Sequence, residues 1–163
     1  PTWNGAAANG AAMVESTDIY RVYFHGPAFQ VLDGVQREGD AVIGKLRTEL
    51  PAFTGSPVSM LTVPRLLELC LQTAGVWEIG KTGVLALPTA IERVVVHRFP
   101  EPGSALYAQI TPRPGSDDVL CFDGRVVDEQ GTVYLEMGGY RTARLPASID
   151  PEQVAPLKAA VAD

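Results

Sequence analysis

Apolar and polar positions along the chain predict a sheet-dominated protein. Stretches rich in β-branched and aromatic residues are separated by turn signals, a pattern typical of strands. They cover residues 31–35, 41–50, 87–98, 105–112, 119–128 and 132–144. Gly39 and Gly131 lie in turn segments between neighbouring stretches. Because the final stretch alternates apolar and polar residues, we expect an antiparallel sheet with one face packed and the other exposed to solvent.

One segment, residues 62–80, has the pattern of a helix instead. Thr62 is a candidate N-cap, Pro64 falls near the first turn, and Gly80 is placed to end the helix. Apolar side chains occupy most of the circumference, which suits a helix enclosed by protein rather than one at the surface. The sequence therefore predicts an α+β architecture, in which a long antiparallel sheet wraps around one central helix at about residues 64–79.

The two ends differ in composition from this central region. Residues 1–17 begin with a Gly-containing run of small residues without periodicity, which is typical of a flexible linker, so we expect the chain to start inside a longer one. Residues 147–163 are predicted to form a linker or a short helix, because alanine favours helix whereas Pro156 would break it. Residues 18–146 are then the folded domain.

Length and charge narrow the range of functions. The 163 residues, 46% of them hydrophobic, suffice for one domain with one core. Thirteen Lys and Arg against nineteen Asp and Glu give a net charge of −6 without a basic block, which argues against nucleic-acid binding. No apolar run approaches the roughly 20 residues of a membrane span, and the beginning lacks the basic region of a signal peptide. We therefore expect a cytoplasmic protein without membrane association.

The sequence predicts neither a metal site nor a nucleotide site. Cys70 and Cys121 lie far apart, without a Cys-x-x-Cys pair or a nearby histidine cluster, so we expect two buried free thiols and no metal. The glycines at positions 34, 39 and 44 lack the strand-to-helix context of a phosphate-binding loop.

The candidate chemistry lies on the predicted helix. Glu68 and Gln72 are four residues apart, and hence on one face, among apolar neighbours. A carboxyl group buried without a partner tends to keep its proton, which a general acid working near neutral pH requires. A structural role is the alternative: Glu68 would pair with Arg65 or another arginine, and Gln72 would bond a neighbouring carbonyl.

Two linked motifs resemble those of a known family. A Tyr-x-His-Gly-Pro-x-Phe segment is formed by Tyr23, His25, Gly26, Pro27 and Phe29. This segment resembles the Tyr/His-Gly-Pro-x-Phe motif in the dehydratase domains of polyketide and polyunsaturated fatty acid synthases. The helix segment at 66–72 is similar to their Leu-Leu-Asp-Ala-x-x-Gln helix, and later stretches resemble the following strand and the penultimate hairpin. The resemblance runs from about residue 19 to residue 146.

This resemblance implies a hot-dog fold, in which a strongly curved antiparallel sheet wraps a long helix. The family's dehydratase is a double hot dog, whose first half supplies a catalytic histidine and whose second half supplies an Asp from its helix. The chain resembles the C-terminal half, with Glu68 at the position of that Asp; small bacterial hydroxyacyl-carrier-protein dehydratases also use a Glu at the corresponding helix position. Neither His25 nor His97 lies in the family's His-x-x-x-Gly-x-x-x-x-Pro motif. The base is therefore expected from upstream sequence, and the chain alone is expected to be inactive.

The implied function is that of a dehydratase-like domain of a multi-domain polyketide or fatty acid synthase. It would act on 3-hydroxyacyl thioesters carried on the phosphopantetheine of an acyl carrier protein, with no bound cofactor. Glu68 is expected to be the general acid, and Gln72 to orient it or the leaving water. The residues expected to line the substrate pocket are Tyr23, His25, Gly26, Pro27 and Phe29.

Two other functions remain open at this point. The absence of the catalytic histidine motif allows a non-catalytic hot-dog module that completes the synthase fold or holds the acyl chain. An acyl-thioesterase is the other, since hot-dog enzymes of that kind also use helix carboxylates. The expected partners are the acyl carrier protein and the N-terminal hot-dog half of the same synthase. We also expect the isolated chain to form a homodimer through the surface that normally meets that half.

Overall fold

The computed structural model describes residues 13–51, 59–114 and 119–162. The elements in chain order are β1 (Val14–Glu15), α1 (Ser16–Val22), a 3-10 turn (Pro27–Phe29), β2 (Leu32–Glu38), β3 (Ala41–Leu46), α2 (Ser59–Thr82), β4 (Val84–Ala90), β5 (Arg93–Val96), β6 (Tyr107–Arg113), β7 (Cys121–Val127), β8 (Val133–Ser148) and α3 (Pro151–Ala160).

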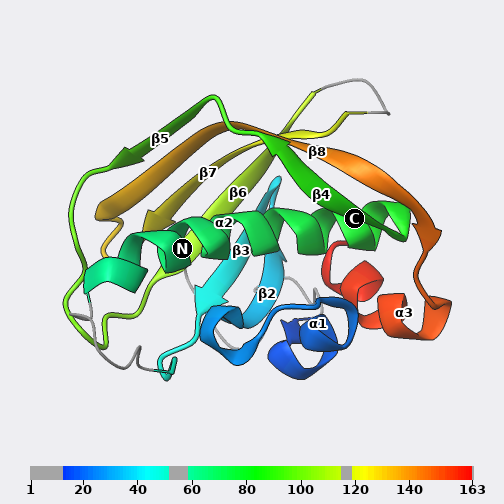
Figure 1. The fold of residues 1–163 in the computed structure, drawn as a ribbon, viewed down its shortest axis with the longest axis horizontal. Coiled ribbons are helices and arrows are strands. Elements are labelled where there is room, and N and C mark those ends of the chain that lie inside the picture. Colours follow the sequence, from blue (N-terminus) through cyan, green and yellow to red (C-terminus); the bar gives the residue numbers. More distant parts are fainter. Residues whose placement is uncertain (1–12, 52–58, 115–118, 163) are drawn as a thin grey trace.

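The described strands form one curved antiparallel sheet that wraps around α2 (Figure 1). Their order is β1-β2-β3-β6-β7-β8-β4, and β5 pairs with the first part of β8 while β4 pairs with its last part. Helix α2 contacts β2, β3, β4, β6, β7 and β8, so its buried residues form the centre of the main core. The predicted arrangement of a long sheet around one central helix is confirmed.

Helix α2 is longer than the sequence predicted at both ends. It begins at Ser59 instead of near Thr62, which places Pro64 within the helix. Gly80 does not end it, because Gly80 lies against α3, where a Cβ atom would collide with Val161 and with the backbone of Leu157. The helix ends instead at Thr82. Gly83 follows it, donates its N–H to the carbonyl of Ile79 at 2.7 Å, and turns the chain away from the helix with a φ of 73°.

The stretch predicted as one strand over residues 87–98 divides into β4 and β5. Both pair with β8, and the register shifts between Pro88 and Ala90. Between the two strands, Glu92 forms an ion pair with Arg141 of β8. Gly139 of β8, with a φ of 65°, lies against Glu92 at the same point. The paired edge therefore bends here, and one continuous partner strand cannot follow it.

The predicted domain boundaries need correction at both ends. Residues 13–17 are not a linker, because β1 joins the sheet and Val14 is buried in the core, as is Ile19 of α1; residues 1–12 lie outside the described part. At the C-terminal end, where a linker or a short helix was predicted, the structure has the helix α3. Asp150 caps α3 by accepting a hydrogen bond from the Glu152 N–H at 2.9 Å. Pro156 does not break the helix, because α3 packs on α2 and buries its apolar face.

No helix within the described residues is long and apolar enough to cross a membrane.

Candidate functional site

Both the amide nitrogen and the amide oxygen of Gln72 form hydrogen bonds. One turn along α2 from Glu68, its amide nitrogen donates to Glu68 Oε1 at 2.9 Å and to the carbonyl oxygen of Phe29 at 2.8 Å. Its amide oxygen accepts from the Tyr20 hydroxyl at 2.7 Å. The Gln72 side chain is almost fully buried, so these bonds fix the orientation of the amide and, through it, one oxygen of Glu68.

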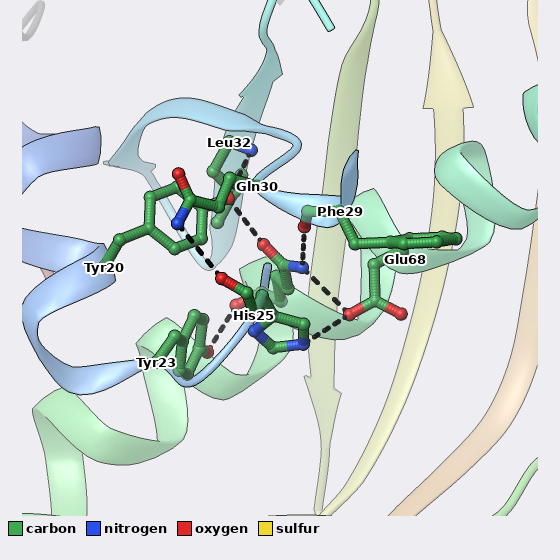
Figure 2. A network of polar contacts seen from close by, with 8 residues as sticks. Tyr20, Tyr23, His25, Phe29, Gln30, Leu32 and Glu68 are labelled. Carbon is green, nitrogen blue, oxygen red and sulfur yellow. Dashed lines mark hydrogen bonds and ion pairs between the residues drawn. The ribbon is translucent and has the colours of Figure 1, made fainter. Parts of the chain in front are cut away.

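His25 contacts the same carboxyl oxygen. Its Nε2 lies 2.9 Å from Glu68 Oε1, so both partners of Glu68 drawn in Figure 2 meet a single oxygen, and the other oxygen points away from them. His25 is set in place by the 3-10 turn that follows it, where Phe29 N–H donates to the Gly26 carbonyl at 2.9 Å. The Gln30 side chain also donates to the His25 carbonyl at 3.0 Å. His25 Nδ1 is buried without a hydrogen-bond partner in the described part of the protein.

Tyr20 is a member of the site that sequence reasoning missed. Its hydroxyl accepts from the Leu32 N–H at 2.8 Å and donates to Gln72, which links the start of β2 to α2 (Figure 2). Burial raises the pKa of the Tyr20 hydroxyl, which therefore keeps its proton and serves as a donor. No motif includes Tyr20. The only signal in the sequence is its spacing, because Tyr20 lies three residues, or about one helical turn, before Tyr23.

Tyr23 packs directly on α2. Its hydroxyl donates to the backbone carbonyl of Gln72 at 2.8 Å, and its ring meets the imidazole of His25 edge-on at 5.3 Å. This approach needs a glycine at position 75, because a Cβ atom there would collide with the Tyr23 hydroxyl. Gly75 thus lets the segment before the 3-10 turn lie close against the helix.

These residues open onto a cavity of about 190 Å³ between α2, β4 and β8. The predicted residues Tyr23, His25, Glu68 and Gln72 all line it. Gly26, Pro27 and Phe29 do not: they form the turn, and Phe29 contributes its carbonyl oxygen to Gln72. The lining residues that sequence reasoning did not name are Phe24, Leu71, Gly75, Glu78, Leu85, Ala86, Leu87, Pro88, Tyr140 and Thr142.

The structural alternative for Glu68 is only half right. Arg65 does not pair with Glu68; its guanidinium donates to the carbonyl oxygens of Ala28 at 3.1 Å and Pro51 at 2.6 Å. Gln72 does bond a neighbouring carbonyl, as that alternative expected, but it bonds Glu68 as well. The carboxyl group is therefore held by neutral groups and an imidazole at the wall of a cavity.

Four further residues of interest lie outside this site. His97 follows β5 and lies 3.2 Å from Glu136, and it does not line the cavity. Trp77 meets the Phe122 ring edge-on at 5.7 Å in the core. Cys70 is buried and free as predicted, and burial raises the pKa of its thiol to about 12. Cys121 is free but only partly buried, which corrects the prediction of two buried thiols.

The described residues contain no group of three or more side chains placed to hold a metal ion.

The fold and the site together define a hot-dog protein: a curled antiparallel sheet around a central helix that presents a carboxyl group to a cavity. Solved structures of this kind are similar to the chain. The dehydratase domain of a trans-AT polyketide synthase from Brevibacillus brevis has a TM-score of 0.67 and 23% identity, over 82% of this chain and 49% of that one. The bifunctional dehydratase-cyclase domain in ambruticin biosynthesis has a TM-score of 0.62 and 24% identity, over 89% and 50%.

A third similar structure is the dehydratase domain of PpsC from Mycobacterium tuberculosis in complex with C12:1-CoA, with a TM-score of 0.60 and 21% identity over 82% of this chain and 52% of that one. The chain thus spans about half the length of these structures. A family model described as the polyketide synthase dehydratase N-terminal domain matches residues 2–152. The chain belongs to this polyketide synthase dehydratase family. The description names the N-terminal domain, whereas the motifs quoted above resemble the C-terminal half.

Proposed function

We propose that the chain is the acid-bearing hot-dog half of a dehydratase that removes water from 3-hydroxyacyl thioesters within a polyketide synthase. The observation that carries this proposal is the placement of Glu68, whose Oε1 is held by Gln72 and His25 at the wall of a cavity. The presence of a helix acid, together with the absence of the family's catalytic histidine motif from the sequence, favours the C-terminal half. The chain's length, about half that of similar dehydratase structures, is consistent with one half of a double hot dog.

The elimination needs an acid and a base. A base removes the proton from C2 of the substrate, the double bond forms between C2 and C3, and the hydroxyl on C3 leaves as water after taking a proton from the acid. Glu68 supplies this proton from Oε2, the oxygen that points away from His25 and Gln72 (Figure 2). Gln72 keeps the carboxyl group in one orientation, so the acid meets the leaving hydroxyl without reorganisation.

His25 is a positioning residue in this proposal and not the base. Its Nε2 is engaged with Glu68, and its Nδ1 is buried, so neither nitrogen is open to a substrate proton at C2. The base is the histidine expected from the upstream half. The substrate reaches the site on the phosphopantetheine arm of an acyl carrier protein, and no bound cofactor or metal takes part.

The upstream half would dock on the edge formed by β4 and β5. Among the described strands, these two pair only with β8, so their outer edge is unpaired (Figure 1). Large apolar side chains are exposed on or beside this edge, namely Leu87, Val94, Val96 and Phe99. An unpaired apolar edge is a site for strand pairing. In the isolated chain the same edge would pair with a second copy, and light scattering that finds only monomer at micromolar concentrations contradicts this homodimer.

The function is tested by hydration of a crotonyl-pantetheine thioester, which is the reverse reaction, followed by loss of enoyl absorbance. The chain is assayed alone and with the upstream half added. Turnover only in the mixture supports the proposal. Release of free thiol instead of hydration would identify a thioesterase. A folded mixture without turnover would leave the acyl-holding module as the function.

A further inference from the structure

The cavity beside Glu68 changes character along its length. At Glu68 and His25, about a fifth of each side chain is exposed (21% and 22%), and Phe24 beside them is 73% exposed. Ten residues further along α2, which is a rise of about 15 Å, Glu78 is only 1% exposed and lines the same cavity with Thr142. The cavity therefore runs from an accessible end, where the reaction is proposed to occur, to a buried end at Glu78.

The buried end holds polar atoms without partners. Glu78 Oε2 and Thr142 Oγ1 are both buried and their side chains are neighbours, but neither atom has a hydrogen-bond partner of good geometry within the described part of the chain. The other oxygen, Glu78 Oε1, lies 3.9 Å from Nε of Arg144, which is beyond hydrogen-bond distance. Burial raises the pKa of the Glu78 carboxyl, although a hydrogen-bonding contact with the Thr142 hydroxyl and the charge of Arg144 partly oppose this. Because unpaired buried polar groups are destabilising, these atoms call for a ligand that pairs with both.

The walls between the two ends are suited to a hydrocarbon segment. On one side β4 contributes Leu85, Leu87 and Pro88, and on the other α2 contributes Leu71 and Gly75. Tyr23, Gln72 and Tyr140 line the same cavity, and Glu78 and Thr142 are the polar residues at its buried end.

We propose that Glu78 and Thr142 form a subsite that recognises a hydroxyl group on the acyl chain, about ten carbons beyond the carbon that loses water. A hydroxyl can donate to Glu78 Oε2 and accept from Thr142 Oγ1 at the same time. A saturated hydrocarbon segment offers neither atom a hydrogen-bond partner. The subsite thus selects 3-hydroxyacyl chains that carry a second, distal hydroxyl group. This assignment rests on the proposed function for its identification of the ligand as an acyl chain.

Binding to the full chain tests this subsite independently of turnover. The probes are hexadecanoyl-pantetheine amides, which cannot be hydrolysed as thioesters, either unsubstituted or with one hydroxyl at the eleventh, twelfth, thirteenth, fourteenth or fifteenth carbon, because an extended chain needs about ten carbons to cover the rise of about 15 Å between Glu68 and Glu78. Isothermal titration calorimetry is expected to find one hydroxylated probe that binds about 10- to 100-fold more tightly than the unsubstituted probe. Equal binding of all probes, or no detectable binding of any, overturns the assignment.

Variants separate recognition from a structural role of Glu78. Glu78→Leu is expected to abolish the preference for the hydroxylated probe, and Thr142→Val to reduce it, in proteins whose folding is checked by thermal unfolding. Arg144→Ala is the matched control, because it removes the neighbour of Glu78 Oε1 and leaves Oε2 and Thr142 in place. If Glu78→Leu fails to fold, Thr142→Val decides the outcome. A preference that survives Thr142→Val unchanged, or that Arg144→Ala abolishes, contradicts the subsite.

The crotonyl hydration assay on the same proteins distinguishes the two proposals. Probe discrimination without turnover in the presence of the upstream half would refute the dehydratase and retain the subsite. Turnover without discrimination would refute the subsite and retain the dehydratase.

Discussion

His25 Nε2 and Glu68 Oε1 lie 2.9 Å apart, although one residue precedes a 3-10 turn and the other lies in the middle of the central helix. The contact joins the two motifs that carried the family resemblance. It also shows how the His-Gly-Pro segment and the helix depend on each other: the turn orients the imidazole, and the imidazole fixes one oxygen of the Glu68 carboxyl group. The other oxygen points away from both contacts (Figure 2).

Tyr20 is expected to be worth more to stability than an ordinary tyrosine hydroxyl. Tyr20→Phe leaves the buried N–H of Leu32 and the amide oxygen of Gln72 without partners, so we expect the free energy of unfolding to fall by about 1–3 kcal/mol. Urea unfolding measures this. Tyr134→Phe is the control, because among the described residues its hydroxyl bonds only Asp128 near the sheet's last hairpin. A loss there as large as that of Tyr20→Phe would contradict the account.

Gly75 and Tyr23 are expected to be coupled. Alanine is normally about 1 kcal/mol better than glycine within a helix, but here its Cβ would collide with the Tyr23 hydroxyl. We expect Gly75→Ala to destabilise the protein by about 1–3 kcal/mol, and by clearly less in a Tyr23→Phe background. A double-mutant cycle measures the coupling. Additive effects of the two substitutions would show that the contact carries no energy.

Glu78 gives stability a pH dependence of predictable sign. Because burial raises its pKa in the folded protein, the folded state holds the proton more tightly than the unfolded chain does. The stabilisation that comes from this tighter proton binding is complete below the ordinary carboxyl pKa of about 4. It is lost as the pH rises through the raised pKa of Glu78 in the folded protein. Wild-type protein is therefore expected to lose more stability than Glu78→Gln as the pH rises from that point, measured by urea unfolding at a series of pH values.

Asp123 provides the control for this pH series, because its shift has the opposite sign. Hydrogen bonding to Arg113 holds the pKa of Asp123 below its ordinary value. Its contribution is present above the ordinary carboxyl value and is lost as the pH falls through the lowered one. Asp123→Asn should thus reduce the loss of stability as the pH falls, whereas Glu78→Gln should reduce the loss of stability as the pH rises. The same direction for both variants would contradict the assignment of Glu78.

The two cysteines are expected to differ in reactivity. Cys70 is buried with its thiol pKa raised to about 12, whereas Cys121 is partly exposed. Since the thiolate is the reactive form, one equivalent of thiol should react with Ellman's reagent in native protein and two in urea. Cys121→Ser should remove the native signal. Native reactivity that persists in this variant would contradict the burial of Cys70.

Sequence patterns predicted the elements better than their ends. The apolar circumference of α2 marked it as central, but its start and end depend on tertiary contacts: Gly80 lies against α3, and Gly83 supplies the positive φ. Pro156 shows the same limit, since burial of α3 on α2 outweighs the local preference. The strand predicted over 87–98 divides where β8 bends, which the pattern of that strand alone does not reveal.

In the site, the motifs marked residues that lie close together, but not which of them line the cavity. Glu68, Gln72, Tyr23 and His25 line one cavity, whereas the other motif residues form the turn beside it. Tyr20 was missed because its role depends on a hydrogen bond to the backbone of β2. Glu78 could have been noticed as a second acid on an otherwise apolar helix, but only the fold shows that it lines the same cavity as Glu68.

The most direct test of the central claim is the rate of dehydration of a 3-hydroxybutyryl group carried on an acyl carrier protein, measured with this chain and the upstream half. Glu68→Gln preserves the size of the side chain and removes the acid, so the rate is predicted to fall by about 10²- to 10⁴-fold. Glu49→Gln, at an exposed carboxyl group outside the cavity, should leave it unchanged. A Glu68→Gln protein that dehydrates the substrate at the wild-type rate would show that Glu68 is not the acid.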